Sequence, residues 1–98
     1  MEFIIKNIQK STSDLMRSIG YQPAYFQKPG EVSIVRQLTR NDYPRFHLYI
    51  KQKGVDMNFS LHLDQKKASY EGSTGHSGDY DGDVVEGEVE RIKSLLGA

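Results

Sequence analysis

The sequence predicts a small α+β domain: a helix, a three-stranded antiparallel β-meander, a long glycine-rich loop and a C-terminal helix. Two observations indicate this fold class. Three segments alternate apolar and polar residues with a period of two, which is typical of half-buried antiparallel strands. Two further segments, one near each end of the chain, repeat apolar residues every three or four positions, as amphipathic helices do. Because a sheet with one apolar face is stabilised by helices that cover it, both helices are expected on that face.

The first helix is expected over residues 4–19, and Gly20 would end it. The residues that recur at helical spacing are Ile5, Ile8, Thr12, Leu15 and Ile19. A second interpretation stays open, because Ser11 and Asp14 have the spacing of a capping box. In that case residues 3–8 form an edge strand and only residues 13–19 are helical. One long helix is the preferred prediction. A connector over residues 22–30 follows, which Tyr25 and Phe26 are expected to anchor to the core.

The meander is expected to consist of residues 32–38, 46–51 and 57–64. A tight turn at residues 53–56, with Gly54 in it, would place Lys53 opposite Asp56. This register, or one displaced by two residues, puts every apolar side chain on one face. The pairs then expected are Ile50 with Phe59, Leu48 with Leu61, Phe46 with Leu63, Tyr49 with Ser60, His47 with His62, and Arg45 with Asp64.

The end of the chain is expected to be a glycine-rich loop over residues 65–82 and a helix that begins at Asp83. A long loop without periodicity in a small domain is usually functional or mobile. Asp83 and Glu86 have capping-box spacing, and Gly97 would end the helix. The apolar stripe of this helix consists of Val85, Val89, Ile92 and Leu96.

Length and composition exclude several classes of protein. The 98 residues fit a single domain spanning 1–98. Thirteen basic and 13 acidic residues give zero net charge, which argues against a strong non-specific nucleic-acid binder. The absence of cysteine excludes disulfides, thiolate metal sites and cysteine nucleophiles. No signal-peptide pattern begins the chain and no apolar run approaches ~18 residues, so we expect a cytoplasmic protein without a membrane partner.

All three histidines fall in or beside one region of the predicted sheet. His47 and His62 are expected neighbours, and His76 lies in the loop that follows. With Asp64 they would provide imidazole and carboxylate ligands for zinc or another divalent metal. A metal-dependent site of this kind, which could be hydrolytic, is the alternative functional hypothesis, although no complete metal motif supports it.

Two other chemical motifs are rejected. Asp79, Asp81 and Asp83 have the spacing of a calcium loop, but Val84 stands where that loop needs glycine. Ser60, His62 and Asp64 alternate on one strand, where side chains are ~6.6 Å apart, which predicts that they cannot hydrogen-bond directly.

The preferred hypothesis is a small, non-enzymatic binding or interaction domain. Its working surface would be the polar sheet face together with the glycine-rich loop. A protein, peptide or small ligand is favoured over nucleic acid, because one tyrosine is a thin stacking platform. The ligand-binding candidates are Arg45, His47, Tyr49, His62, Asp64, His76 and Tyr80.

Overall fold

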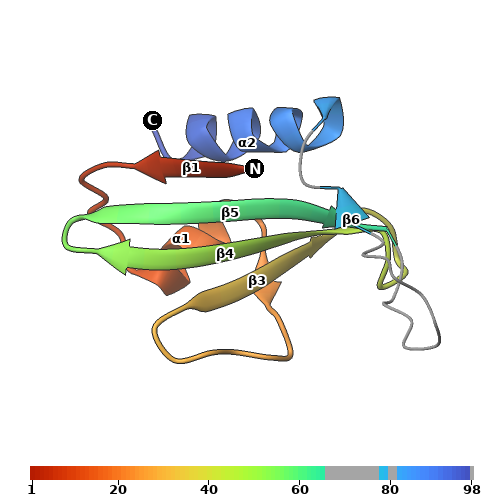
Figure 1. The fold of residues 1–98 in the computed structure, drawn as a ribbon, viewed down its shortest axis with the longest axis horizontal. Helices are drawn as coiled ribbons and strands as arrows, with labels where there is room; N and C mark the ends of the chain where they lie inside the picture. Colours follow the sequence, from red (N-terminus) through yellow and green to blue (C-terminus); the bar gives the residue numbers. More distant parts are fainter. Residues whose placement is uncertain (66–77, 80–81, 98) are drawn as a thin grey trace.

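The computed structural model describes residues 1–65, 78–79 and 82–97, which form an α+β fold with an antiparallel sheet and two helices (Figure 1). The strand order in the sheet is β1-β5-β4-β3-β2, and β6 pairs with β5. The described elements are β1 (Glu2–Ile5), α1 (Thr12–Ser18), β2 (Gln22–Pro23), β3 (Val32–Gln37), β4 (Arg45–Lys53), β5 (Asp56–Asp64), β6 (Gly78–Asp79) and α2 (Asp83–Leu95).

The predicted meander and its register are confirmed. Strands β3, β4 and β5 are consecutive antiparallel neighbours, and Lys53 lies opposite Asp56. Gly54 has φ of 64°, a conformation that glycine adopts without steric cost, so the tight turn forms as expected. All six predicted cross-strand pairs are present, including His47 with His62. The sheet has more strands than the three predicted, because short strands extend it on both sides.

The prediction of one helix over residues 4–19 is wrong, and the alternative of a strand followed by a short helix is confirmed. Residues 2–5 form β1, which pairs with β5 and stacks the Phe3 ring on Phe59 at a centroid distance of 4.8 Å. Asn7 has φ of 58°, a left-handed backbone conformation, so a right-handed helix cannot continue through this residue. The hydroxyl of Ser11 accepts a hydrogen bond from the Asp14 backbone N–H at 3.1 Å. Because the Ser11 side chain caps the helix, α1 begins at Thr12 and not near residue 4.

Helix α2 begins at Asp83 as predicted, but its capping differs. Gly82 occupies the N-cap position, and no side chain caps the helix there within the described residues. Asp83 and Glu86 instead lie in the first turn, where their negative charges interact favourably with the helix dipole. At the other end Gly97 has φ of 76°, which is the left-handed conformation expected just beyond a helix.

The two helices cover one face of the sheet, as predicted. In Figure 1, α2 runs beside β1 and α1 lies behind the sheet. Within the described residues, neither helix has the length and apolar character needed to cross a bilayer. The buried hydrophobic cluster consists of Ile5, Leu15, Ile19, Tyr21, Ile34, Phe46, Leu48, Ile50, Met57, Phe59, Leu61, Leu63, Val85, Val89 and Ile92.

One buried carboxylate ties α2 to the rest of the fold. Glu88 is 4% exposed and accepts a 2.6 Å hydrogen bond from the Tyr21 hydroxyl. Arg91 donates to both Glu88 oxygens, at 2.7 and 2.9 Å, and also to the Ile19 carbonyl. Arg36 of β3 adds a longer contact of 3.4 Å. Burial and the adjacent Glu88 carboxylate raise the pKa of Tyr21 well above its usual value.

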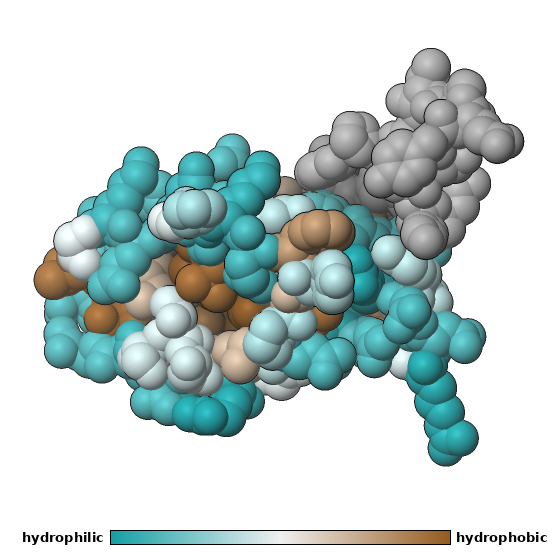
Figure 2. Space-filling view, turned by 90° about the horizontal axis from the view of Figure 1, so that it is seen from below, coloured by the Kyte–Doolittle hydropathy of each residue, from teal (hydrophilic) through white to brown (hydrophobic). Residues whose placement is uncertain are grey.

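Some large hydrophobic side chains remain at the surface. Seen from below the view of Figure 1, hydrophobic residues are visible in the middle of the molecule with hydrophilic residues around them (Figure 2). The expectation that Tyr25 and Phe26 anchor their connector to the core is wrong, because these residues are 94% and 81% exposed. Their rings pack instead on each other, with centroids 5.0 Å apart. Phe26 also lines a cavity of about 650 Å³ on the polar face of the sheet.

Candidate functional site

The candidate site lies on the polar face of the sheet, where β4 and β5 pair. His47 and His62 are directly opposed, and their ring centroids are 5.1 Å apart with the planes tilted by 40°. Arg45 and Asp64 form the neighbouring pair on the same face of these two strands. The alternation of apolar and polar residues sends all four side chains to the face opposite the core. The sequence therefore predicted this grouping correctly.

Asp64 connects the two imidazoles. Its Oδ1 atom lies 2.8 Å from His62 Nε2, and its Oδ2 atom lies 3.4 Å from His47 Nδ1. The expectation that alternate residues of this strand cannot hydrogen-bond is wrong for His62 and Asp64, because the long imidazole side chain spans the gap between them. Ser60, on the same face of the strand, has no described hydrogen bond to His62, so a Ser60–His62–Asp64 relay is not formed within the described residues.

The charge of Asp64 is stabilised by its surroundings. Burial by itself would raise the pKa of this carboxyl, but the hydrogen bonds from His47 and His62 outweigh burial and hold the pKa well below its usual value. Asp64 is therefore an ionised acceptor at neutral pH, and an imidazole nitrogen that hydrogen-bonds to it must carry a proton. With its proton on Nδ1, the neutral His47 ring has a free lone pair on Nε2.

Ser33 of β3 is the site residue that the sequence reasoning missed. Its hydroxyl oxygen lies 2.5 Å from His47 Nε2, and the residue is only 4% exposed. Ser33 pairs with Tyr49 across β3 and β4, so His47 is its diagonal neighbour on the same face. The register between β3 and β4 would predict this contact, but the seven-residue connection at 38–44 contains no turn motif that defines that register.

The backbone of Ser33 is also held in place. Its N–H donates to Gln27 Oε1 at 2.9 Å, and its carbonyl accepts from Gln27 Nε2 at 2.8 Å. The Ala24 N–H donates to the same carbonyl at 2.9 Å. These bonds fasten the connector between β2 and β3 to the strand that carries the hydroxyl.

Tyr49 completes an aromatic layer over the two histidines. Its ring stacks on His47 with a centroid distance of 4.3 Å and an interplanar angle of 21°. It also lies 5.6 Å from the His62 ring at 27°. The hydroxyl is 3.5 Å from His47 Nδ1, which is a long contact. The three rings therefore support one another and limit rotation of the His47 side chain.

Arg45 is placed beside Asp64 without a strong bond to it. Its Nε atom is 3.6 Å from Asp64 Oδ2, and within the described residues this buried nitrogen has no hydrogen-bond partner. The guanidinium carbon lies 4.6 Å from the centre of the Tyr43 ring, a cation–π contact. Arg45 thus adds positive charge next to Asp64 while its head group packs on an aromatic side chain.

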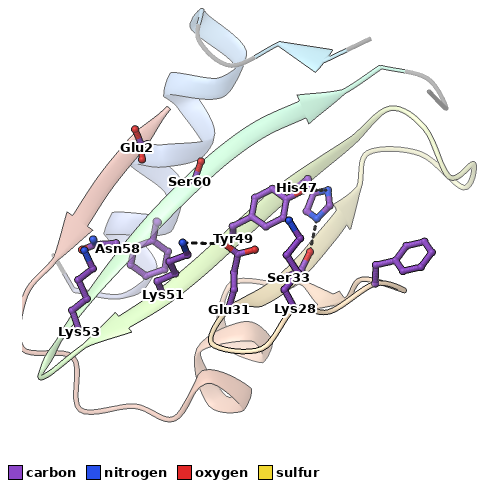
Figure 3. A pocket seen from close by; sticks show the side chains of 12 residues that line it. Glu2, Lys28, Glu31, Ser33, His47, Tyr49, Lys51, Lys53, Asn58 and Ser60 are labelled. Carbon is purple, nitrogen blue, oxygen red and sulfur yellow. Dashed lines mark hydrogen bonds and ion pairs between the residues drawn. The ribbon is translucent and has the colours of Figure 1, made fainter. Parts of the chain in front are cut away.

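A cavity of about 650 Å³ opens beside this cluster, over the polar sheet face. Figure 3 shows Lys28 extending over this face from the connector, on the same side as Ser33 and His47. Lys51 and Glu31 form an ion pair of 3.8 Å within the lining. The lining residues are Glu2, Phe26, Lys28, Glu31, Ser33, His47, Tyr49, Lys51, Lys53, Asn58, Phe59 and Ser60.

Three of the four predicted metal ligands are brought together. His47, His62 and Asp64 each offer one ligand atom, and these atoms lie within 4.8 Å of one another. The fourth predicted ligand, His76, and the candidate Tyr80 lie outside the described residues. Of the glycine-rich loop, Gly78 and Asp79 are described as β6, whose main chain pairs with Asp64 and Leu63.

Comparison with protein-family models, with characterised proteins and with solved structures gives no significant match to this chain. The function of the site is therefore inferred from its geometry and chemistry. Two imidazoles contact one ionised carboxylate, and the buried Ser33 hydroxyl contacts one of these imidazoles. A cavity with cationic side chains lies beside them.

Proposed function

We propose that the protein is a small binding domain whose ligand occupies the cavity on the polar sheet face. The observation that carries the proposal is the size and composition of this cavity. Its volume of about 650 Å³ falls within the range of small-molecule sites, about 300–1,000 Å³. A small ligand is favoured over a protein partner because the surface is concave. Binding, without catalysis, is all that this function requires.

The lining indicates the class of ligand. Tyr49 provides an aromatic surface that is held by stacking on His47, so little conformational entropy is lost when a ring packs against it. Three lysines line the cavity, and the two glutamates, one of them paired with Lys51, leave a net positive lining. A ring-bearing molecule with an acidic group fits this combination, and Ser33, Asn58 and Ser60 add hydrogen-bonding groups.

A nuclear magnetic resonance titration with ring-bearing carboxylates tests this proposal. Backbone amide shifts should concentrate at β3, β4 and the connector that carries Lys28. Tyr49→Ala should weaken binding about three- to ten-fold, whereas Tyr49→Phe keeps the ring and should bind nearly as tightly as the wild type. Lys28→Gln should weaken binding in a salt-dependent way, and Lys10→Gln, outside the cavity lining, should not. Shifts scattered over the surface, or no effect of Tyr49→Ala, would contradict the proposal.

A metal site at His47, His62 and Asp64 is the second candidate. The observation that favours it is the convergence of three ligand atoms, since two imidazoles and one carboxylate with open positions suit zinc or a similar divalent ion. The metal site ranks below ligand binding because of Arg45. Its guanidinium is 3.6 Å from Asp64 and competes with a metal cation for the carboxylate.

Thermal unfolding with zinc and with EDTA tests the metal candidate. Zinc at about 100 times its dissociation constant should stabilise the folded protein by about 2.7 kcal/mol. His62→Gln should abolish the stabilisation, and His76→Gln tests whether the fourth predicted ligand contributes. No stabilisation at any zinc concentration would remove this candidate.

A further inference from the structure

Ser33, His47 and Asp64 form a directional chain of contacts. The Ser33 hydroxyl meets His47 Nε2 at 2.5 Å, and His47 Nδ1 faces Asp64 Oδ2 at 3.4 Å. A hydrogen bond from His47 Nδ1 to an Asp64 oxygen places the ring proton on Nδ1, and in the neutral ring this leaves Nε2 to accept the proton of the hydroxyl. The order of groups is that of a serine nucleophile, a general base and a carboxylate that orients the base.

The geometry points to an activated serine: we propose that Ser33 is a nucleophile for acyl transfer, with His47 as its general base and Asp64 as a positioning residue. This activity goes beyond ligand binding and does not depend on which ligand normally fills the cavity. Longer distances, such as the 3.4 Å between His47 and Asp64, are common in catalytic groups before substrate binds.

The surroundings of the hydroxyl suit this chemistry. Ser33 is 4% exposed, yet it lines the cavity of about 650 Å³, so a substrate can approach the hydroxyl from the cavity. The bonds from Gln27 and Ala24 to the Ser33 backbone fix the strand that carries the nucleophile. Tyr49 stacked on His47 limits rotation of the base. Preorganisation of this kind lowers the entropic cost of reaching the transition state.

The proposed substrate class is a small carboxylic ester. Ser33 Oγ attacks the carbonyl carbon, and its proton passes to His47 Nε2. The bond to the leaving alkoxide then breaks, and that alkoxide takes the proton from His47. Water attacks the resulting ester on Ser33 and gives a proton to His47, which returns it to Oγ as the acid departs. Lys28 lines the same cavity and provides positive charge for the oxyanion that forms in each half of the reaction.

A fluorophosphonate reagent with a small alkyl group tests the inference on the intact, folded protein. Attack by Ser33 forms an O–P bond and releases fluoride, while the proton passes to His47. Peptide mapping by mass spectrometry should find one stoichiometric adduct on Ser33, which is absent in Ser33→Ala. His47→Gln should slow labelling at least about 100-fold, because general-base catalysis typically contributes about 10²–10⁴-fold.

Two controls distinguish this activity from non-specific labelling of serines and from metal-dependent chemistry. Ser13→Ala changes a serine of α1, outside the cavity lining, and should label at the wild-type rate. EDTA should have no effect, because the proposed relay needs no metal. Failure of folded wild-type protein to form an adduct at Ser33, equal labelling of His47→Gln, or labelling abolished by EDTA would overturn the inference. Circular dichroism melts of each variant establish that the fold is retained.

Discussion

His62 Nε2 and Asp64 Oδ1 lie 2.8 Å apart, although the two residues occupy alternate positions of the same strand. Asp64 thereby holds His62 with one oxygen and faces His47 of the neighbouring strand with the other. The side chains of Asp64, His47 and His62 are only 21%, 13% and 11% exposed. A carboxylate shared by two largely hidden imidazoles is the feature around which the polar sheet face is arranged.

The shared carboxylate predicts how stability depends on pH. The hydrogen bonds from the two histidines hold the pKa of Asp64 below its usual value of 3.8, against the opposing effect of burial. A carboxyl whose pKa is lower in the folded state stabilises the fold above the unfolded pKa, and this contribution is lost as the pH falls through the folded value. The free energy of unfolding should therefore fall as the pH drops below about 4.

Asp64→Asn removes this titration. The variant should lose about 1–3 kcal/mol at neutral pH, because a hydrogen-bonding charge is replaced by an amide. Its free energy of unfolding should also change less than that of the wild type below about pH 4. Urea unfolding at a series of pH values measures both effects. Parallel pH profiles for the two proteins would show that Asp64 is not stabilised as an ion.

Removing the cap of α1 should change stability in opposite directions for the observed short helix and for a continuous helix over residues 4–19. Ser11→Ala should destabilise the protein by about 1 kcal/mol, because the backbone N–H of Asp14 loses its acceptor. In a continuous helix over residues 4–19 the same change would place alanine, the best helix former, at an interior position and would be stabilising. Urea unfolding of Ser11→Ala, compared with Ser13→Ala inside the helix, measures the sign. A stabilising effect would favour the long helix.

Replacing Glu88, which lies outside the candidate site, should strongly destabilise the fold. Its side chain is 3% exposed and accepts hydrogen bonds from Tyr21 and Arg91. Glu88→Gln should cost about 3–5 kcal/mol, because Arg91 would be left partly buried without its counter-charge. Glu90→Gln changes an exposed residue of the same helix and should stay within about 0.5 kcal/mol of the wild type. Similar free energies of unfolding for both variants would contradict the buried network.

Much of the sheet followed from the sequence because period-two alternation permits few registers. Once Lys53 and Asp56 were placed across a two-residue turn, the pairing of His47 with His62 followed. The N-terminal segment was harder, since Ile5 and Ile8 fit a helical spacing while the pairing of β1 with β5 depends on residues more than 50 positions away. Tertiary pairing decided that segment, and the local cap at Ser11 was the correct signal.

The candidate site was predicted only where it lies on one hairpin. Arg45, His47, His62 and Asp64 share the register of β4 and β5, so the sequence grouped them. Ser33 contacts His47 from β3, the strand paired with β4. No turn motif in the connection between β3 and β4 specifies how these two strands align. The contact between His62 and Asp64 was missed for another reason, because Cα spacing along a strand underestimates the reach of an imidazole ring.

The protonation of His47 tests the central claim most directly, namely that Asp64 and Ser33 orient this imidazole for work in the adjacent cavity. Long-range ¹H–¹⁵N correlation spectra of the histidine rings distinguish the two neutral tautomers. The expected result is that the neutral form of His47 carries its proton on Nδ1, with a bare Nε2 facing Ser33, and that Asp64→Asn loses this preference. A His47 ring that carries its proton on Nε2, or that averages between tautomers in the wild type, would contradict the account.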